Sequence, residues 1–428
     1  MITVEEALTH VAEWTQPLPA RRVPLGESLG LRLAEPIVSD IDSPPFDKSM
    51  LDGFAIASSD TSPTRRIIEQ VIAGGVPHHA VHPGVTIQVM TGAPLPDGAD
   101  AVVKHEITER LDETTVRLPN EKFKEGDGIF RRGSSFRIGE EVLPSGKQLR
   151  AIDLALLAEV GKAIVSVLPR PRIAVLSTGN ELVECGKPLA MGQIRNSNGP
   201  MLVAAVTESG AAPIDLGIAR DDVEELRTAI VGGLHADILL ITGGVSAGVM
   251  DLVPAVLTEL SVEQVFHKVR MKPGKPLWFG VREADGRRTL VFGLPGNPVS
   301  TLVSFQLFVK PAIAALAGGE FSNAKFVRGQ LTAAAKHRGE RPTYHPCKID
   351  RSPQGQDTVE PLPWRGSVDL AALTRANGLM LLPAGDYELT IGTPIDALPL
   401  YRPMLERLTN DRTDPCDERA CRGVESYD

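Results

Sequence analysis

The stretch Ile173–Glu181 (IAVLSTGNE) decides the fold, because an apolar run passes directly into a loop of small and polar residues. Consecutive apolar residues in such a short run indicate a strand that is buried on both faces of a sheet. The same pattern returns at Asp237–Ile241 and Leu290–Phe292. Helices are expected around these strands, at residues 200–209, 222–232, 251–260 and 298–317. Repeated β–α units predict a parallel sheet with helices on both faces.

Three of these predicted strands end in loops of small residues, at the strand ends where open α/β sheets bind their ligands. Small side chains let backbone N–H groups approach an anion, and the N-termini of the following helices favour negative charge. The loops match neither the Walker nor the Rossmann glycine pattern. They therefore predict an anion or nucleotide site of another type. Its candidate residues are Ser177, Thr178, Gly179, Gly243, Gly244, Ser246, Pro295, Gly296 and Asn297.

Acidic residues fall at the same predicted rim. Glu181 ends the first loop, Asp221 follows a short strand at residues 213–217, and Asp251 follows the second loop. Carboxylates that face a phosphate would repel it, and a Mg²⁺ ion shared between them removes the conflict. We therefore expect Glu181, Asp221 and Asp251 to bind Mg²⁺. Helix capping is the alternative role for the two aspartates, with Asp221 as the N-cap of the helix at residues 222–232.

Four cationic residues occur within an eight-residue segment after the expected helix at residues 251–260. They are Lys268, Arg270, Lys272 and Lys275. If this segment is a strand, alternation places the first three on one face. A solvated edge strand is one interpretation. The prolines and glycine around the lysines favour a shaped turn instead, in which the lysines act as point charges on a tetrahedral oxyanion.

Composition limits the classes of protein that the chain can represent. The formal net charge is −9, which argues against a general nucleic-acid binder. The sequence has no obvious uninterrupted apolar run of membrane-spanning length, and the N-terminus lacks the pattern of a signal peptide. Four scattered cysteines fit a reducing compartment, so we expect a cytoplasmic protein that binds neither nucleic acid nor membrane.

Several domains are expected, because 428 residues exceed the size of one ordinary core. The chain opens on an amphipathic helix that Thr3 and Glu6 begin as a capping box. Short apolar runs between glycines and prolines indicate strands on both sides of the α/β segment. We expect an elongated linker domain at 1–43 and 141–168 (with the first helix able to pack elsewhere), a β-rich domain at 44–140, the α/β domain at 169–319, a C-terminal β domain at 320–404, and a disordered tail at 405–428.

Six segments, taken together and in order, make the chain similar to one known family. They are Phe46–Ala55, Met90–Pro96, Leu176–Leu182, Thr242–Gly248, Met271–Pro276 and Gly293–Ser300. The sequence resembles the molybdopterin molybdenumtransferases, the family of MoeA and the gephyrin E domain, from about residue 1 to 404. The resemblance implies a multidomain α/β plus β fold. A central parallel α/β sandwich domain similar to MogA would lie between β-rich N-terminal domains and a C-terminal β-barrel-like domain.

The resemblance also implies an activity: molybdate reacts with adenylylated molybdopterin, AMP leaves, and molybdenum cofactor forms in the presence of Mg²⁺. Glu181, Asp221 and Asp251 match the family's acidic rim. The resemblance assigns the remaining roles to Lys268, Lys272 and Lys275 near the pterin phosphate and molybdate, to Pro276 beside them, to Asp52 and Thr91 from the partner subunit of a homodimer, and to Arg341 and Ser367 at the oxyanion. No nucleophilic side chain is required, because the dithiolene of the substrate receives the metal.

Two other functions stay open at this point. A molybdopterin adenylyltransferase of the MogA type shares the central domain, although it has Thr-Gly-Gly-Thr-Gly where this chain has Val245-Ser246 after the glycines. A non-catalytic scaffold like gephyrin could use the same fold for partner binding, and the retained acids and lysines argue against it. Transient partners implied by the resemblance are the adenylyltransferase and the molybdoenzymes that accept the cofactor.

Overall fold

The computed structural model describes residues 1–245, 252–284, 286–351, 355 and 357–400. It divides into two compact units, one formed by Met1–Pro19 together with the chain from Pro169, and one formed by Ala20–Leu168. Three features of interest lie outside the described residues. They are Ser246, Asp251 and the tail from residue 405 with Cys416 and Cys421.

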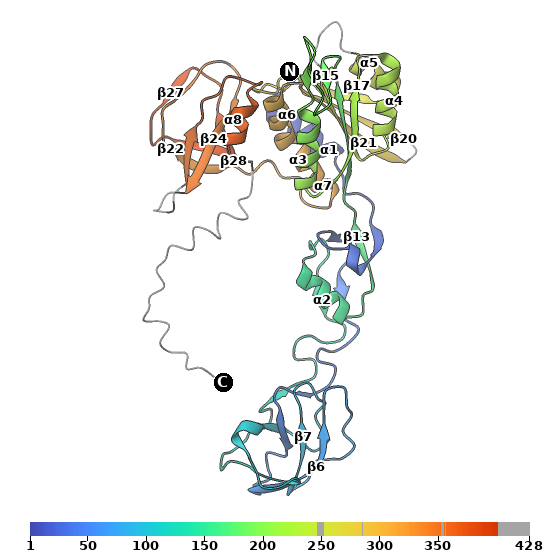
Figure 1. Ribbon diagram of the computed structural model, residues 1–428, viewed down its shortest axis with the longest axis vertical. Coiled ribbons are helices and arrows are strands. Elements are labelled where there is room, and N and C mark those ends of the chain that lie inside the picture. The colour runs from blue at the N-terminus through green and yellow to red at the C-terminus, as the bar shows by residue number, and fades with distance from the viewer. Residues whose placement is uncertain (246–251, 285, 352–354, 356, 401–428) are drawn as a thin grey trace. The chain divides into compact units, whose positions relative to one another are not determined.

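A six-stranded sheet forms the centre of the first unit (Figure 1). Its order is β17 (Ala212–Ala219), β14 (Arg172–Thr178), β18 (Ile238–Thr242), β21 (Arg287–Leu294), β20 (Trp278–Ala284) and β19 (Glu263–His267). The first four strands are parallel, which confirms the expected parallel sheet. The antiparallel strands β20 and β19 extend it, and neither was predicted.

Helices cover both faces of this sheet, as the alternation predicts. On one face α4 (Val223–Gly233) and α5 (Val253–Glu259) pack against residues such as Leu176 and Leu239. On the other face lie α3 (Asn198–Glu208) and the helix that begins at Pro298. Asp222, rather than Asp221 as expected, is the N-cap of α4, because its side chain accepts the backbone N–H groups of Glu224 and Glu225. Asp221 is therefore not the cap of this helix.

The first helix, α1 (Val4–Trp14), belongs to this unit and not to the linker segment that follows it in the chain. Thr3 and Glu6 form the predicted capping box, with bonds of 2.7 and 3.1 Å. The buried face of the helix joins the core that contains Ile173 of the central sheet. The N-terminal cap contributes only about 1 kcal/mol to the stability of this helix. Most of its stability therefore comes from burial of the apolar face.

The chain from Pro298 to Leu316 forms one continuous helix of the core. It consists of α6 (Pro298–Ser304), a π-helical turn, η3 (Phe305–Val309), and α7 (Lys310–Leu316). Among the described residues it is the one helix long and apolar enough to cross a membrane, and 89% of its apolar window is buried inside the structure. Such burial is what the core helix of a folded domain shows.

The C-terminal domain is a closed barrel of five strands. Its strands are β22 (Val327–Leu331), β25 (Asp357–Pro361), β24 (Thr343–Arg351), β26 (Gly378–Leu382) and β28 (Pro394–Pro399). A two-stranded ribbon of β23 (Ala335–His337) and β27 (Tyr387–Leu389) and the short helix α8 (Leu370–Arg375) complete it. The barrel confirms the expected fold of the C-terminal domain, which was predicted to be a β-barrel-like domain.

The second unit has separate cores. One of them gathers residues from β1 (Arg21–Pro24), β2 (Arg32–Leu33), β13 (Ile164–Leu168) and α2 (Ala151–Glu159). The others lie on a six-stranded sheet of β8 (Ala101–Lys104), β5 (Gly53–Ile56), β7 (Val85–Val89), β6 (Thr64–Val71), β10 (Thr115–Arg117) and β9 (Glu109–Arg110). Four of these strands coincide with the short apolar runs at residues 53–56, 85–89, 100–103 and 115–118, which predict strands in the β-rich domain.

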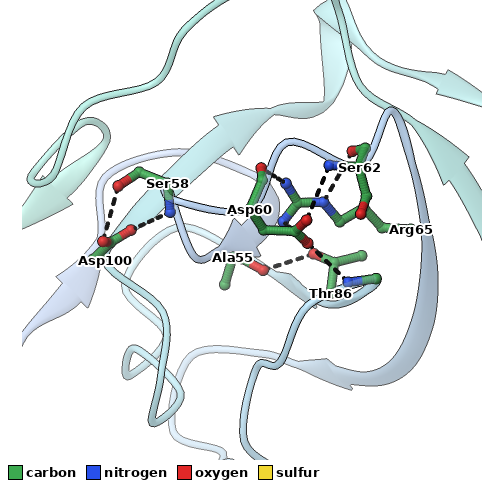
Figure 2. Close-up of polar contacts among 8 residues, drawn as sticks. Ala55, Ser58, Asp60, Ser62, Arg65, Thr86 and Asp100 are labelled. Carbon is green, nitrogen blue, oxygen red and sulfur yellow. Dashed lines mark hydrogen bonds and ion pairs between the residues drawn. The ribbon is translucent and has the colours of Figure 1, made fainter.

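Figure 2 shows a buried ion pair between Arg65, near the start of strand β6, and Asp60. Arg65 is 2% exposed and lies 3.2 Å from the carboxylate of Asp60. The same carboxylate accepts backbone N–H groups of Ser62 and Gly84 at 2.9 and 2.8 Å. Hydrogen bonds that fill the remaining sites of a buried charge are what make such a pair tolerable in a core.

Candidate functional site

Glycine loops meet at the carboxyl ends of β14, β18 and β21, as the sequence predicts. The backbone N–H of Gly243 donates to Leu294 O at 3.2 Å. A Cβ on Gly243 would lie 2.4 Å from Thr178 O, and its φ of +92° favours glycine. Gly296 is also close, since its Cβ would lie 3.8 Å from the Cα of Gly243. Any larger residue at 243 would push these loops apart.

Asn198, which the sequence argument did not single out, ties two of these loops together. Its Nδ2 donates to Thr242 Oγ1 at 2.9 Å and to Gly296 O at 2.7 Å. Thr242 Oγ1 in turn donates to Pro295 O at 3.2 Å. A carbonyl can only accept, so the amide orientation is fixed and Oδ1 is left as an acceptor. The only sequence signal was its place at the start of a helix beside the rim.

Two buried polar atoms of the rim have no hydrogen-bond partner within the described protein: Asn198 Oδ1 and Thr178 Oγ1. Their residues are 8% and 2% exposed, respectively. Buried polar groups without partners cost about 1–3 kcal/mol each, and native structures contain few of them. Their occurrence beside the glycine loops is consistent with a site built to receive a ligand.

The acidic residues lie on neighbouring loops of the same rim. Asn180 N donates to Asp221 Oδ2 at 3.3 Å, and Asp221 N donates to Asn180 Oδ1 at 3.2 Å. Glu181 follows directly and is exposed, and its carboxylate lies 2.5 Å from where a Cβ on Gly179 would stand. Carboxylate oxygens of this kind suit Mg²⁺. The described parts of the chain hold no group of three or more potential metal-binding side chains, and Asp251 lies outside them.

The cationic segment is not a strand. Lys268 has a left-handed backbone (φ +72°), and only isolated bridges occur from there to Lys275. The segment follows the turn that its prolines and glycine favour, and not the edge strand, because the positive φ values and the Pro273-Gly274 turn break the extended path. Its cations still converge: a pocket of about 340 Å³ is lined by Met1, Arg270, Lys272, Lys275, Arg338, Gly339, Glu340 and Arg341. Lys268 and Pro276 are not among the lining residues.

The barrel supplies the other wall of this cationic pocket. Lys272 N donates to Pro342 O at 2.9 Å, and Tyr344 N donates to Lys272 O at 2.8 Å. The guanidinium of Arg341 donates to Met271 O at 3.1 Å. The structure thus brings Arg341 beside Lys272 and Lys275, as the family resemblance implies. Arg270 and Arg338 add two cations to the set, of which Arg338 was not a candidate.

Ser367 contacts the rim and not the cationic pocket. Its Oγ accepts from Asn297 Nδ2 at 2.9 Å, and its carbonyl accepts from Val299 N at 3.1 Å. At the other end of α6, Ser304 lies beside the turn of residues 272–275, which we call the lysine turn. A Cβ on Gly274 would come within 3.0 Å of Ser304 Oγ. A helix of this length spans about 10 Å. We call the glycine loops at the carboxyl ends of β14, β18 and β21 the glycine rim. The glycine rim and the cationic pocket therefore lie near opposite ends of helix α6.

Asp52 and Thr91 lie together in the second unit, and both are exposed. Asp52 Oδ1 accepts the backbone N–H of Thr91 at 2.6 Å and its hydroxyl at 2.8 Å. These hydrogen bonds, the backbone one first, lower the pKa of the Asp52 carboxyl below its usual 3.8. The pair therefore presents a fixed, ionised carboxylate.

Comparison with known proteins defines the class to which this fold and site belong. Residues 2–161 match the MoeA N-terminal region (domains I and II), residues 174–315 match a "probable molybdopterin binding domain", and residues 328–400 match the MoeA C-terminal region (domain IV). A MoeA protein from Pyrococcus horikoshii is 31% identical, with a TM-score of 0.79 over 94% of this chain and 100% of that one. The fold and the matched regions are therefore those of a multidomain protein of the MoeA class.

Curated relatives narrow this class to one family. The molybdopterin molybdenumtransferase of Staphylococcus aureus (strain Mu50) is 34% identical over 409 residues, which cover 93% of this chain and 95% of the relative. That of Bacillus subtilis (strain 168) is 32% identical over 407 residues, covering 93% and 94%. The chain belongs to the molybdopterin molybdenumtransferase family.

Proposed function

We propose that this protein inserts molybdenum, delivered as molybdate, into molybdopterin and so forms molybdenum cofactor. One observation carries the proposal: five cationic side chains line a single pocket in the unit that also contains the molybdopterin-binding-type domain. A dianionic oxyanion needs such a concentration of positive charge to leave water. The proposed reaction follows from the names of the relatives, which are molybdopterin molybdenumtransferases. The cationic pocket is the proposed binding site for molybdate.

We further propose that the pterin substrate is adenylylated and that AMP leaves during the reaction. Glycine loops at strand ends, followed by the N-terminus of the α6 helix, suit a phosphate group. Asn198 Oδ1 is a buried acceptor without a partner, so it suits an N–H or O–H group of the same ligand. The spacing of about 10 Å along α6 suits a ligand that carries a reactive group at some distance from its nucleotide.

Mg²⁺ fits the acidic side of this rim, where Glu181 and Asp221 offer hard oxygen donors on adjoining loops. We propose that these two residues and Asp251 hold the ion, which would offset negative charge on the phosphoanhydride. The protein itself positions the anions. Lys272, Lys275 and Arg341 hold the oxyanion, while the glycine loops hold the nucleotide. None of these steps requires a nucleophilic side chain.

A homodimer with shared sites is part of the proposal, with Asp52 and Thr91 acting on the partner subunit's site, in the cytoplasm. Mixing Asp52→Ala with Lys275→Ala subunits tests it. Half of the dimers would be mixed, each with one intact site, so about a quarter of the parent activity should return. Mixtures as inactive as either variant alone would contradict shared sites.

Substrate preference separates the proposal from an adenylyltransferase. The full chain is incubated with ATP and molybdopterin in one reaction, and with adenylylated molybdopterin and molybdate in another. We expect molybdenum cofactor and AMP in the second reaction only. Accumulation of adenylylated pterin in the first would show the rival activity, and no turnover in either would favour a non-catalytic scaffold.

A further inference from the structure

A buried histidine lies at the base of the arginine loop, which we define as residues 338–342 between β23 and β24. His337 is the last residue of β23 and is 4% exposed. Its Nδ1 lies 2.7 Å from Gly385 O, and its Nε2 lies 2.9 Å from Thr343 Oγ1. Its ring also stacks on Tyr387, with the centroids 5.5 Å apart. Both nitrogens of this ring are therefore engaged inside the barrel.

The partners fix the tautomer of His337. Gly385 O can only accept, so Nδ1 carries the proton and donates it. In the neutral ring, Nε2 then accepts from the hydroxyl of Thr343. Thr343 is the first residue of β24. The bond from His337 to Thr343 therefore closes the neck of the arginine loop, while the bond to Gly385 attaches that neck to the turn before β27 (orange in Figure 1).

The loop itself is fastened on two further sides. Gly339 N donates to Asp386 Oδ1 at 2.8 Å, and Gly339 O accepts from Gly385 N at 2.9 Å. On the side of the lysine turn, Glu340 O accepts from Arg270 Nε at 3.1 Å, and Pro342 O accepts from Lys272 N at 2.9 Å. His337 thus lies at the junction between the barrel and the loop that lines the cationic pocket.

Electrostatics explain why the loop needs such an anchor. Arg338 and Arg341 face Arg270, Lys272 and Lys275 around one pocket, with Glu340 the single acidic side chain among the lining residues. Like charges that line the same pocket repel one another until an anion binds. A loop free to move would separate its arginines from the lysines. The anion would then have to bring them together at the expense of affinity.

We propose that His337 is a positioning residue for oxyanion binding. Through Thr343 and Gly385 it holds the arginine loop so that Arg338 and Arg341 meet the incoming oxyanion together with the lysines. The proposal rests on the proposed function only in naming molybdate as that oxyanion. Because both hydrogen bonds of His337 stay within the barrel, its loss weakens the binding of the oxyanion and spares that of the pterin nucleotide.

Four variants of the full chain test this role. His337→Leu removes both hydrogen bonds, His337→Asn keeps a donor for Gly385 O, and Thr343→Val removes the hydroxyl alone. Val359→Ala, in the core of the same barrel, is the matched control for general destabilisation. The measurements are molybdate affinity by calorimetry, KM for each substrate, melting temperature, and hydrogen exchange of residues 338–341.

We expect His337→Leu to weaken molybdate binding about tenfold, as the loss of such hydrogen bonds would. KM for the pterin nucleotide should stay within twofold, and exchange of the loop amides should rise. Thr343→Val should act in the same direction, and His337→Asn should recover part of the affinity. Unchanged exchange of the loop, unchanged affinity, or an equal change in Val359→Ala at matched melting temperature would overturn the proposal. A parent protein that binds no molybdate would remove the proposed function, whereas the exchange measurement tests the anchor by itself.

Discussion

At the scale of single residues, the site depends on polar atoms whose partners are settled by geometry. Asn198 is the clearest case, because two oxygen acceptors fix its amide and leave Oδ1 for a ligand donor. An asparagine near the start of a helix is normally interpreted as a cap. Sequence alone cannot separate the two roles, since the second depends on loops that are 44 and 98 residues away.

Replacing Asn198 by aspartate should weaken the binding of the pterin nucleotide. The carboxylate would face Thr242 Oγ1 and Gly296 O, lose the donation to both, and repel the carbonyl. We expect KM for the pterin nucleotide to rise about tenfold or more and KM for molybdate to stay unchanged. Asn377→Asp is the matched control, because it also removes a donation to a backbone carbonyl, that of Ile349 in the barrel. Equal KM values in parent and Asn198→Asp would contradict this role.

At the scale of elements, the lysine turn shows how a short segment can be shaped by one glycine. Gly274 has a φ of +108°, and a Cβ there would meet Met271 Cε at 2.0 Å and Ser304 Oγ at 3.0 Å. The turn therefore rests directly on helix α6. A side chain at this position would lift the turn and carry the lysines on either side away from the pocket.

Gly274→Ala should therefore destabilise the protein and weaken oxyanion binding. The left-handed backbone costs an alanine about 1–2 kcal/mol, and the overlap adds about 1–3 kcal/mol. Gly286→Ala is the matched control, because its φ is +70° and its Cβ would meet nothing within 4 Å. Denaturant unfolding and molybdate affinity are measured for both. Equal losses in the two variants would contradict the steric account of the lysine turn.

Acid sensitivity should arise in helix α2, where Asp153 is buried. The side chain of Arg150 donates to its carboxylate and, with lesser contributions from the Arg150 backbone and Lys147, lowers its pKa from 3.8 to about 2. Because the folded pKa is the lower one, this carboxylate stabilises the fold above pH 3.8, and the contribution disappears as pH falls to about 2. Melting temperatures of the full chain across this window should fall more steeply in the parent than in Asp153→Asn. The exposed control Glu121→Gln should follow the parent, and parallel curves for all three would contradict the assignment.

Elements with a regular pattern could be predicted, and irregular ones could not. The apolar runs of β14, β18 and β21 predicted the parallel strands, because burial on both faces leaves no polar positions. Strand β19 escaped prediction because a register shift between Gln264 and Phe266 breaks its alternation. The N-cap of α4 is Asp222 and not Asp221. The sequence could not distinguish these adjacent aspartates, because the choice depends on the residue at which the helical backbone begins.

At the scale of the whole molecule, two family regions combine to form the site. The α/β region supplies the glycine rim and the lysine turn, and the barrel supplies Arg338 and Arg341. The sequence pattern of the α/β region alone predicted an anion site without naming the anion. Ser367 illustrates the limit of carrying a role across by resemblance: it was expected at the oxyanion, and it contacts Asn297 on the rim. Which barrel residues face the lysines depends on packing between domains, which no local pattern records.

The most direct test of the account measures molybdate-dependent formation of molybdenum cofactor from adenylylated molybdopterin by the full chain. The double variant Lys272→Ala/Lys275→Ala removes two cations from the pocket. The matched double variant Lys336→Ala/Lys348→Ala removes two exposed lysines of the barrel that pair with Glu388 and Asp350. Two lost charge-assisted hydrogen bonds should lower product formation at least about 100-fold in the first variant and leave the second near the parent. Product formation by the first variant at the rate of the parent would contradict the assignment of the cationic pocket to molybdate.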